Sequence, residues 1–543
     1  MDADGTQVSG QGMSGERPPQ APETFTRKAS GLIRSATVLD VLGFNVLCGL
    51  TGIAALWLLV LGPPLYPGAN LVLATLIGGL AALPLVMVYA RLSAVYPRSG
   101  GEYVYASRLL HPAVGFAVNV GFTVAILFIM AIGGNYLANY GLAPLLRVAG
   151  AYWSSPGLVN AGNWLTEPLG MFLLGTATIV AFGLLFILGG MRVYWPVQNV
   201  LMIMASLSVI VIVIWGLVVS RQTAFAHIAQ ALGNVGGKSL EPLATGTAAP
   251  FSWSETIKAS IWANFGIVGV FFTAYIGGEV KRPARTQAIG MLVSWAWVTG
   301  WMAAICAAMV HLFGTPFFAN MLDADMSKYG LSAAPAFQEL SGLGLGSGVA
   351  AVILLVLFLG WGLGGIPTSI MMCSRTIFSW SLDRVVPGWL SHVSTRSAVP
   401  YNAVWAMMII GVIFTAALAW GWMTVLGGSY GFFAAFAAAA LSAVVLAYRN
   451  PSLWRSSPGH TRLWGVATTT WWGLVSLLVA IVFPVYLLLI DPVAGITPRY
   501  NFNQFIVFPI IIVVAFAGYY VARAIQKGRG IDLDLKFQEI PPD

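Results

Sequence analysis

Two hydrophobic segments of this chain, 36–61 and 257–278, contain glycines in their middle, and each glycine weakens a helix at that point. The glycines are Gly43, Gly49, Gly52, Gly266, Gly269, Gly277 and Gly278. Glycine-interrupted segments in matching places of two halves of a chain are typical of the substrate site of a secondary transporter. The alternative is that these small residues only permit close packing of helices.

A break in a helix exposes backbone groups that can bind charge. N–H groups remain unpaired where the second half begins, and C=O groups remain unpaired where the first half ends. These two ends carry partial charges of about plus and minus one half. The positive end can therefore hold a carboxylate, and the negative end can hold an ammonium group or a sodium ion. A zwitterionic amino acid matches both ends without any charged side chain.

The amino-acid composition indicates a membrane protein. Hydrophobic residues make up 58% of the chain and charged residues 8%, against roughly 25% charged in an ordinary soluble domain. The three cysteines, Cys48, Cys306 and Cys373, all lie in apolar runs, so we expect no disulfide framework. The five histidines are scattered and have no zinc-ligand spacing. The residues that give the net charge of +8 are distributed over the loops, and this distribution argues against a nucleic-acid partner.

Twelve apolar runs are long enough to cross a bilayer, which takes about 20 residues. They cover 36–61, 69–90, 113–140, 168–189, 196–219, 257–278, 287–313, 348–373, 402–421, 424–447, 468–490 and 503–524. The fold expected is an all-α polytopic membrane protein. Because the second interrupted run lies five spans after the first, the second half enters the membrane from the opposite side, which is an inverted repeat.

The same pattern divides the chain into a single transmembrane domain with two tails. The expected divisions are a disordered tail at 1–34, the transporter domain at 35–526 and a charged tail at 527–543, with repeats at about 36–219 and 257–447 and two extra helices at about 468–524. With the N-terminus in the cytoplasm, 21 of the 27 Lys and Arg residues lie on the cytoplasmic side. The positive-inside rule therefore places both termini in the cytoplasm and the protein in the cytoplasmic membrane.

Charged residues do not occur near the middle of any predicted span, which disfavours a proton pump or a membrane enzyme. We therefore expect no catalytic residues. At the cytoplasmic end of the spans, Asp40, Arg98, Glu102 and Glu279 could form an ion-pair gate. The alternative is that each is a solvated loop charge.

Four ordered motifs resemble the amino acid–polyamine–organocation (APC) permeases, which have the LeuT-type fold of two inverted five-helix repeats with discontinuous helices 1 and 6. The resemblance covers the chain from Ser35 to about Pro458. The motifs are residues 89–105, residues 265–271 followed by 278–283, Ser374-Arg375 followed by 380–387, and 448–451 followed by 456–458. The resemblance implies transport by alternating access and no cofactor other than a coupling ion.

The resemblance also implies which backbone groups hold the substrate. The amides of Leu50, Thr51 and Gly52 would receive its carboxylate, and the carbonyls of Cys48, Phe265 and Val268 would receive its amine. Phe265 stands where many relatives have an aromatic gate, and the other gate candidates are Asn45, Asn264, Phe271 and Tyr430. Leu50 replaces a common glycine and Phe271 a common glutamate, which favours a larger and more apolar pocket.

Sodium-coupled proteins of this fold bind the ion between carbonyls of the first span and two hydroxyls of the eighth. The matching groups are the carbonyls of Val46, Gly49 and Gly365 and the hydroxyls of Thr368 and Ser369. Hard oxygen donors suit an alkali cation. The alternative is that both hydroxyls bond back to their own helix beside Pro367. Some proton-coupled relatives place a Lys in this cage, but the matching residue is Ala205, so sodium symport is favoured over uniport or exchange.

The sequence thus predicts a permease for an amino acid or related small amine, with a small-molecule substrate and the lipid bilayer as its partners. Two alternatives keep the same fold. In one the cargo is a nucleobase or an inorganic ion, and in the other the protein binds an amino acid as a sensor without moving it.

Overall fold

The protein is an all-α membrane protein built as a bundle of long apolar helices. The computed structural model describes residues 31–49, 51–423, 429–457, 460–485 and 498–538. Within this part of the chain, nine helical stretches are long and apolar enough to cross a membrane. Seven of them are built on α3 (Leu71–Val95), α5 (Pro112–Tyr136), α8 (Pro168–Val218), α11 (Pro283–Phe313), α14 (Gly348–Leu382), α15 (Tyr401–Ala419) and α16 (Ser429–Arg449). The other two are α10 (Trp253–Ile267), extended by the helix that follows it, and α19 (Pro498–Gly528).

Two predicted spans, 168–189 and 196–219, meet in the single stretch α8. Gly190 has φ 62° there, which separates the two helices by a kink. A side chain at this position would lie 2.4 Å from the backbone oxygen of Ser397. Three shorter apolar helices, α1 (Val38–Cys48), α2 (Thr51–Leu65) and α18 (Thr468–Val485), account for the first and eleventh predicted runs. The prediction of an all-α polytopic fold is confirmed, while the count of twelve crossings stays a prediction.

Both predicted helix breaks are present. α1 begins at a capping box in which Thr37 and Asp40 bond to each other's backbone N–H groups, and it ends at Cys48. α2 then begins at Thr51. The second break follows Ile267, where the α-helical α10 tightens into the 3₁₀-helix η3 (Val268–Tyr275), and the short η4 (Gly277–Glu279) follows.

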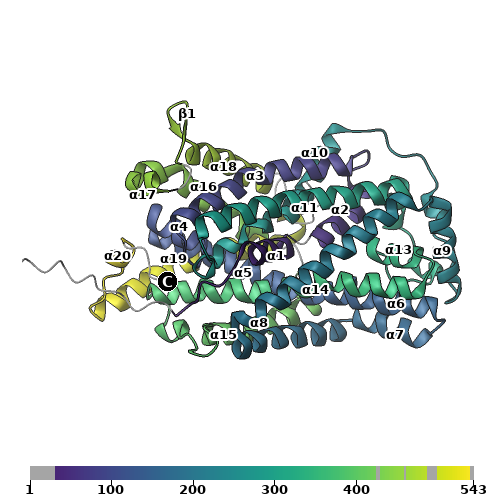
Figure 1. Ribbon diagram of the computed structural model, residues 1–543, viewed down its shortest axis with the longest axis horizontal. Coiled ribbons are helices and arrows are strands. Elements are labelled where there is room, and N and C mark those ends of the chain that lie inside the picture. The colour runs from purple at the N-terminus through teal and green to yellow at the C-terminus, as the bar shows by residue number, and fades with distance from the viewer. Residues whose placement is uncertain (1–30, 50, 424–428, 458–459, 486–497, 539–543) are drawn as a thin grey trace, which may run out of the picture.

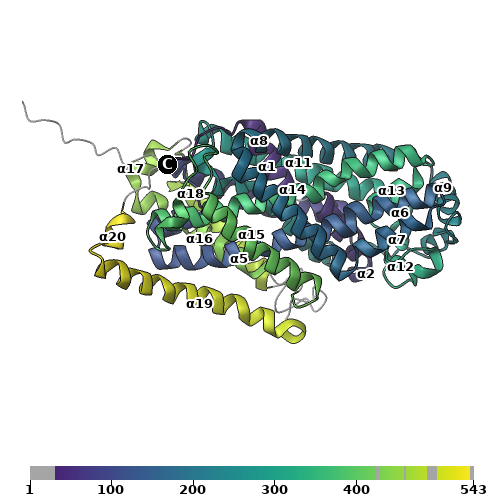
Figure 2. The same cartoon turned by 90° about the horizontal axis from the view of Figure 1, so that it is seen from below.

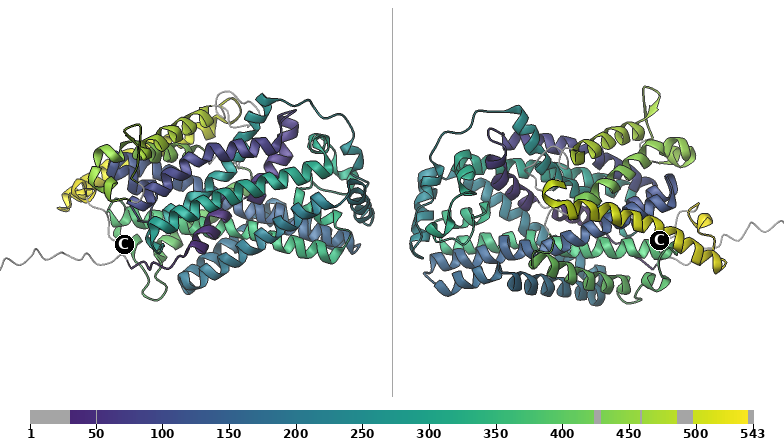
Figure 3. Two further views of the ribbon diagram at one scale, coloured as in Figure 1. Left: turned by 45° about the horizontal axis from the view of Figure 1, so that its top comes forward. Right: turned by 180° about the vertical axis from the view of Figure 1, so that it is seen from behind.

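The broken helices occupy the centre of the bundle (Figure 1). α1 packs against α8, α11, α14 and η3, and α2 packs against α10 and α11. α3 in turn packs along both α10 and α11. The two C-terminal helices are peripheral: α18 lies on α16 and α3, whereas α19 lies along the outside of the bundle against α5 (Figures 2 and 3).

Short elements cover the two ends of the bundle. We call the end that holds the described ends of the chain the terminal face (Figure 1). It carries α4 (Glu102–Leu109), η6 (Gly388–Ser391), α17 (Pro451–Ser456), the hairpin of β1 (Arg462–Leu463) and β2 (Val466–Ala467), and α20 (Leu533–Lys536). The opposite face carries η1 (Leu137–Leu142), α6 (Ala143–Tyr152), α7 (Pro156–Leu165), α9 (Arg221–Gly233), η2 (Glu241–Ala244), α12 (Thr315–Met321), η5 (Met326–Tyr329) and α13 (Phe337–Gly344).

Candidate functional site

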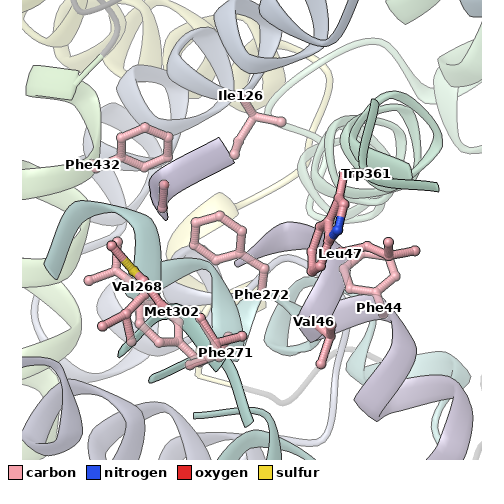
Figure 4. Close-up of a cluster of buried hydrophobic side chains, with 14 of the residues drawn as sticks. Phe44, Val46, Leu47, Ile126, Val268, Phe271, Phe272, Met302, Trp361 and Phe432 are labelled. Atoms are coloured by element: carbon pink, nitrogen blue, oxygen red, sulfur yellow. The ribbon is translucent and has the colours of Figure 1, made fainter. Parts of the chain in front are cut away.

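A cavity lies where the two helix breaks meet. Its volume is about 70 Å³, taken as the space open to the centre of a water molecule. The aromatic part of its lining is Trp57, Phe128, Tyr136, Trp262, Phe265, Phe272, Trp361 and Phe432. The remaining lining residues are Cys48, Ala54, Ala125, Ile129, Ile132, Gly133, Gly266, Val268, Gly269, Gly362 and Gly365. Figure 4 shows the packed core beside this cavity, with Phe272, Trp361 and Phe432 among its side chains.

The two breaks pack backbone against backbone through glycine. A side chain at Gly269 would place its Cβ 2.2 Å from the carbonyl oxygen of Cys48. One turn earlier, a Cβ at Gly266 would lie 2.1 Å from that of Ala54. Both distances are far below any real contact of a Cβ atom, so only glycine permits this approach. This close approach is what the packing interpretation predicts, and the same two glycines also line the cavity.

Residues of both helix breaks line the cavity. Cys48 ends α1, and its carbonyl belongs to the last turn, where C=O groups lack helical partners. Val268 directly follows the end of α10, and it lines the cavity together with Cys48 and Phe265. Three of the predicted substrate residues therefore lie together on the cavity wall.

The remaining predicted substrate residues belong to the start of α2. Gly52 is buried beneath the indole ring of Trp361, whose Cδ1 atom is 3.0 Å from where a Cβ would lie. Leu50 lies outside the described residues. Thr51 begins α2, but its side chain also lies outside the described part of the chain.

The cavity wall offers few polar side-chain atoms. Among the side chains that line it, those of Cys48, Tyr136 and the three tryptophans carry a polar atom. The N–H of Trp262 is used, because it donates to the Tyr66 hydroxyl at 3.1 Å. A ligand would thus meet backbone dipoles at one place and an apolar surface elsewhere. Sequence reasoning missed Trp57, Trp262 and Trp361, since aromatic residues are common in all the spans and nothing local distinguishes these three.

Aromatic rings close the cavity toward the opposite face. Trp57 of α2 lies edge-on to Tyr136, with ring centroids 6.1 Å apart, and edge-on to Trp262 at 5.8 Å. The three rings come from three different helices, α2, α5 and α10. A movement of α2 or α10 would therefore separate them.

Backbone pairing and a buried ion pair close the molecule on the side of the terminal face. The amides of Ser35 and Ala36 both donate to the carbonyl of Glu279 at 2.9 Å, and the amide of Lys281 donates to Ala36 at 3.0 Å. The carboxylate of Glu279 accepts from Arg375 Nε at 2.6 Å, and the two side chains are only 1% and 0% exposed. The segment before α1 is thereby tied to the end of the second broken helix and to α14.

A second buried carboxylate belongs to α4. Glu102 accepts hydrogen bonds from the hydroxyls of Tyr275 and Tyr89 and, at 2.6 Å, from the side-chain amide of Asn119. Burial raises the pKa of the Glu102 carboxyl from 4.5 to about 7, although these hydrogen bonds oppose the rise. Asp40 is also buried and accepts from Asn199 at 2.7 Å. The interpretation as solvated loop charges is therefore wrong for Asp40, Glu102 and Glu279, because tertiary packing covers all three.

The four gate candidates other than Phe265 take different places. Asn45 is buried, and its Oδ1 accepts from the amide of Thr273 at 3.0 Å, which links α1 to η3. Asn264 donates to the carbonyl of Gly78 at 2.9 Å and lines a smaller cavity that also borders Phe265 and Val268. Phe271 is buried and stacks on Tyr89 with ring centroids 4.2 Å apart. The side chain of Tyr430 lies outside the described residues.

The predicted sodium ligands belong to two adjoining helices. Thr368 donates to the carbonyls of Gly364 and Gly365, and Ser369 donates to Gly365 at 2.8 Å. These are the hydrogen bonds to the backbone of their own helix that the alternative interpretation predicts. A hydroxyl that donates a hydrogen bond still has lone pairs that can bind a cation. α14 reaches α1 here, because a Cβ at Gly364 would lie 2.6 Å from the Leu47 side chain. Val46 and Gly49, the other predicted ligands, lie on this same stretch of α1 and its end.

No basic side chain can replace Ala205 without rearrangement. Ala205 is fully buried on α8, and a Cβ at Gly360 of α14 would lie 2.7 Å from its backbone nitrogen. The two helices are therefore in close contact at this point. A longer side chain at position 205 would crowd this contact.

Known proteins similar to this chain include transporters. The sequence profile of the amino acid permease family matches residues 41–521. Uncharacterized transporters of Mycobacterium tuberculosis and Mycobacterium bovis are each 24% identical over 409 residues, which is 74% of this chain and 75% of the relative. A branched-chain amino acid permease of Lactococcus lactis is 23% identical over 374 residues, 65% of this chain and 69% of that protein. This chain therefore belongs to the amino acid permease family, within the APC superfamily.

Proposed function

We propose that this permease is a secondary transporter that moves an amino acid with an uncharged, apolar side chain by alternating access. The observation that carries the proposal is the cavity between the two helix breaks. Its backbone groups suit a zwitterion, while its remaining wall is apolar and largely aromatic. A charged side chain would find no counter-ion among the residues that line this cavity, and burying an unpaired charge is costly.

The positive-inside bias supports placing the terminal face in the cytoplasm. The arrangement described above is then closed to the cytoplasm by the Glu279–Arg375 pair and the backbone bonds beside it. Transport would require two alternating arrangements. In one, the contacts beside Glu279 separate while the aromatic contacts around Trp57 are closed. In the other, the aromatic contacts separate while those beside Glu279 are closed. The first set lies at the ends of the broken helices beside Ala36 and Glu279, whereas the aromatic set lies on the other side of the breaks, on α2 and α10.

We further propose that sodium drives uptake through the oxygens of Thr368 and Ser369 and the carbonyls of Val46, Gly49 and Gly365. The support is that both hydroxyls lie buried on α14 where it contacts the end of α1. An ion at this place would join the two helices and favour the closed cytoplasmic side. Sodium binding and closure would then be linked, because each stabilises the other.

The test is uptake into liposomes of radiolabelled leucine, lysine and glutamate, under an inward sodium gradient, an inward proton gradient or no gradient. We expect leucine to enter, driven by sodium, and the double variant Thr368→Ala/Ser369→Ala to lose the sodium dependence. Thr415→Ala serves as the matched control, because Thr415 is a buried threonine that bonds back to its own helix on α15.

Each result separates the alternatives. Leucine uptake that ignores sodium would contradict the coupling and indicate a uniporter, an exchanger or proton coupling. Leucine binding without uptake would indicate a sensor. Uptake of nucleobases or inorganic ions in place of amino acids would contradict the proposed substrate class.

A further inference from the structure

One polar side-chain group of a cavity-lining residue has no hydrogen-bond partner in the described part of the chain. The indole Nε1–H of Trp361 is buried, and no acceptor in the described part of the chain receives its hydrogen bond. A buried donor without an acceptor costs about 1–3 kcal/mol. A tryptophan kept in such a position therefore suggests that a ligand supplies the missing acceptor.

The Trp361 N–H lies directly above the start of α2. A Cβ at Gly52 would be 3.1 Å from Trp361 Nε1, and Gly52 belongs to the first turn of this 15-residue helix. The amides of a first turn have no helical acceptors and lie at the positive end of the helix dipole. The positive end of the helix dipole and an unpaired indole N–H thus lie at the same place. Each of them favours an anion.

Packing holds the indole in this direction. Trp361 is fully buried on α14 and contacts Trp297 of α11, with ring centroids 6.4 Å apart. Three residues farther along α14, Gly364 fits against Leu47 of α1, so the helix cannot rotate without a clash. Because the ring is already in place, a ligand that uses its N–H pays little conformational entropy.

We infer that the indole N–H of Trp361 donates a hydrogen bond to the substrate carboxylate, which it holds together with the amides at the start of α2. The inference rests on the proposed function and makes it more specific. Trp361 is then a substrate-binding residue that recognises the carboxylate itself, and amines that lack this group are poor substrates. This assigns the protein to amino acids and excludes simple amines from its substrate class.

The experiment measures binding to the purified full-length protein by ligand-induced thermal stabilisation. The probes are leucine, its amide leucinamide, the amine isoamylamine and the acid 4-methylpentanoate, which share one apolar side chain. The variant is Trp361→Phe, which keeps an aromatic ring and removes the N–H. Trp297→Phe is the matched control, because it alters the neighbouring ring, which does not line the cavity.

A hydrogen bond to a charged group corresponds to about a 10- to 100-fold change in affinity. We therefore expect Trp361→Phe to bind leucine about 10- to 100-fold more weakly than the natural protein, while its weak binding of leucinamide and isoamylamine is unchanged. Trp297→Phe should bind leucine within about threefold of the natural protein. An equal loss for leucine and leucinamide, or no loss for either, would overturn the inference and leave the proposed function standing.

The acid 4-methylpentanoate distinguishes a failure of the inference from a failure of the proposed function. If the natural protein binds no amino acid, the proposed function is wrong. Binding of 4-methylpentanoate that weakens in Trp361→Phe would then still support a carboxylate site at Trp361. Absence of binding by all carboxylate probes would overturn both.

Discussion

Removing the charge of Glu279 should open the cavity toward the terminal face. Glu279 and Arg375 are 2.6 Å apart and almost fully buried, so Glu279→Gln leaves the guanidinium of Arg375 without its counter-charge. Arginine cannot lose its proton to relieve this. Breaking one side of a buried ion pair costs about 3–5 kcal/mol. This cost falls on the closed arrangement, because water can hydrate Arg375 once the contact opens.

The size of the shift follows from that cost. Since about 1.4 kcal/mol corresponds to a factor of ten, the ratio of open to closed molecules should rise by roughly 100- to 4000-fold. A large population should then expose the cavity to the terminal face. The backbone bonds from Ser35, Ala36 and Lys281 are present in both proteins and do not change this difference.

Cys48 provides the assay, because it lines the cavity while Cys306 and Cys373 are buried elsewhere. A membrane-impermeant thiol reagent is added to one side of oriented vesicles, and the labelling rate of Cys48 is measured against a Cys48→Ser background. We expect labelling from the terminal face to rise at least tenfold in Glu279→Gln.

The matched control is Glu339→Gln, which breaks the buried pair of Arg147 and Glu339 at the opposite face, where the two bonds are 2.8 and 2.9 Å long. It should not raise labelling from the terminal face. The reasoning is refuted if Glu279→Gln changes that rate by less than threefold, or if Glu339→Gln raises it equally.

Two further perturbations test the breaks and the buried carboxylate. Gly269→Ala should reduce uptake to background and destabilise the protein by about 1–3 kcal/mol through overpacking, because its Cβ would lie 2.2 Å from the Cys48 carbonyl oxygen. Gly300→Ala is the control: a Cβ there would have nothing within 4 Å, so uptake and thermal unfolding should both be unchanged. Glu102 has its pKa raised from 4.5 to about 7 in the closed arrangement, so that arrangement binds the proton more tightly than one in which the carboxyl is hydrated. Closure should therefore be favoured below pH 4.5 and weaken progressively as the pH rises to about 7. Measured as labelling of Cys48 relative to Glu102→Gln, the rate from the terminal face should increase between pH 5 and 7 and then level off; a flat ratio would contradict the role of Glu102.

Local sequence was enough to predict the helix breaks. The breaks at Gly49 and after Ile267 could be predicted because a glycine acts on the backbone of its own helix, whatever the helix packs against. Membrane crossing could be predicted for the same kind of reason, since length and hydropathy belong to each segment by itself. The family resemblance then assigned Cys48, Phe265 and Val268 to the substrate site, and the structure places all three on one cavity.

The partners of buried polar groups could not be predicted in this way. Arg375 belonged to a family motif that indicated no partner for it, and in the structure it pairs with Glu279, which is 96 residues away in the sequence. Glu102 was compatible with a solvated loop charge, but Tyr275 and Asn119 from two other elements enclose it. Sequence position gives no measure of such burial, because it depends on how separate helices cross.

The sequence by itself determined that the chain is a membrane protein and where its helices break. Only the tertiary structure decided what surrounds the breaks: the apolar wall, the aromatic contacts around Trp57 and the indole N–H of Trp361 above the start of α2. The physical reason is that a break is a property of one segment, whereas a binding site is formed by side chains from several helices. Their convergence depends on the rotation and crossing of each helix, which packing fixes and local sequence does not.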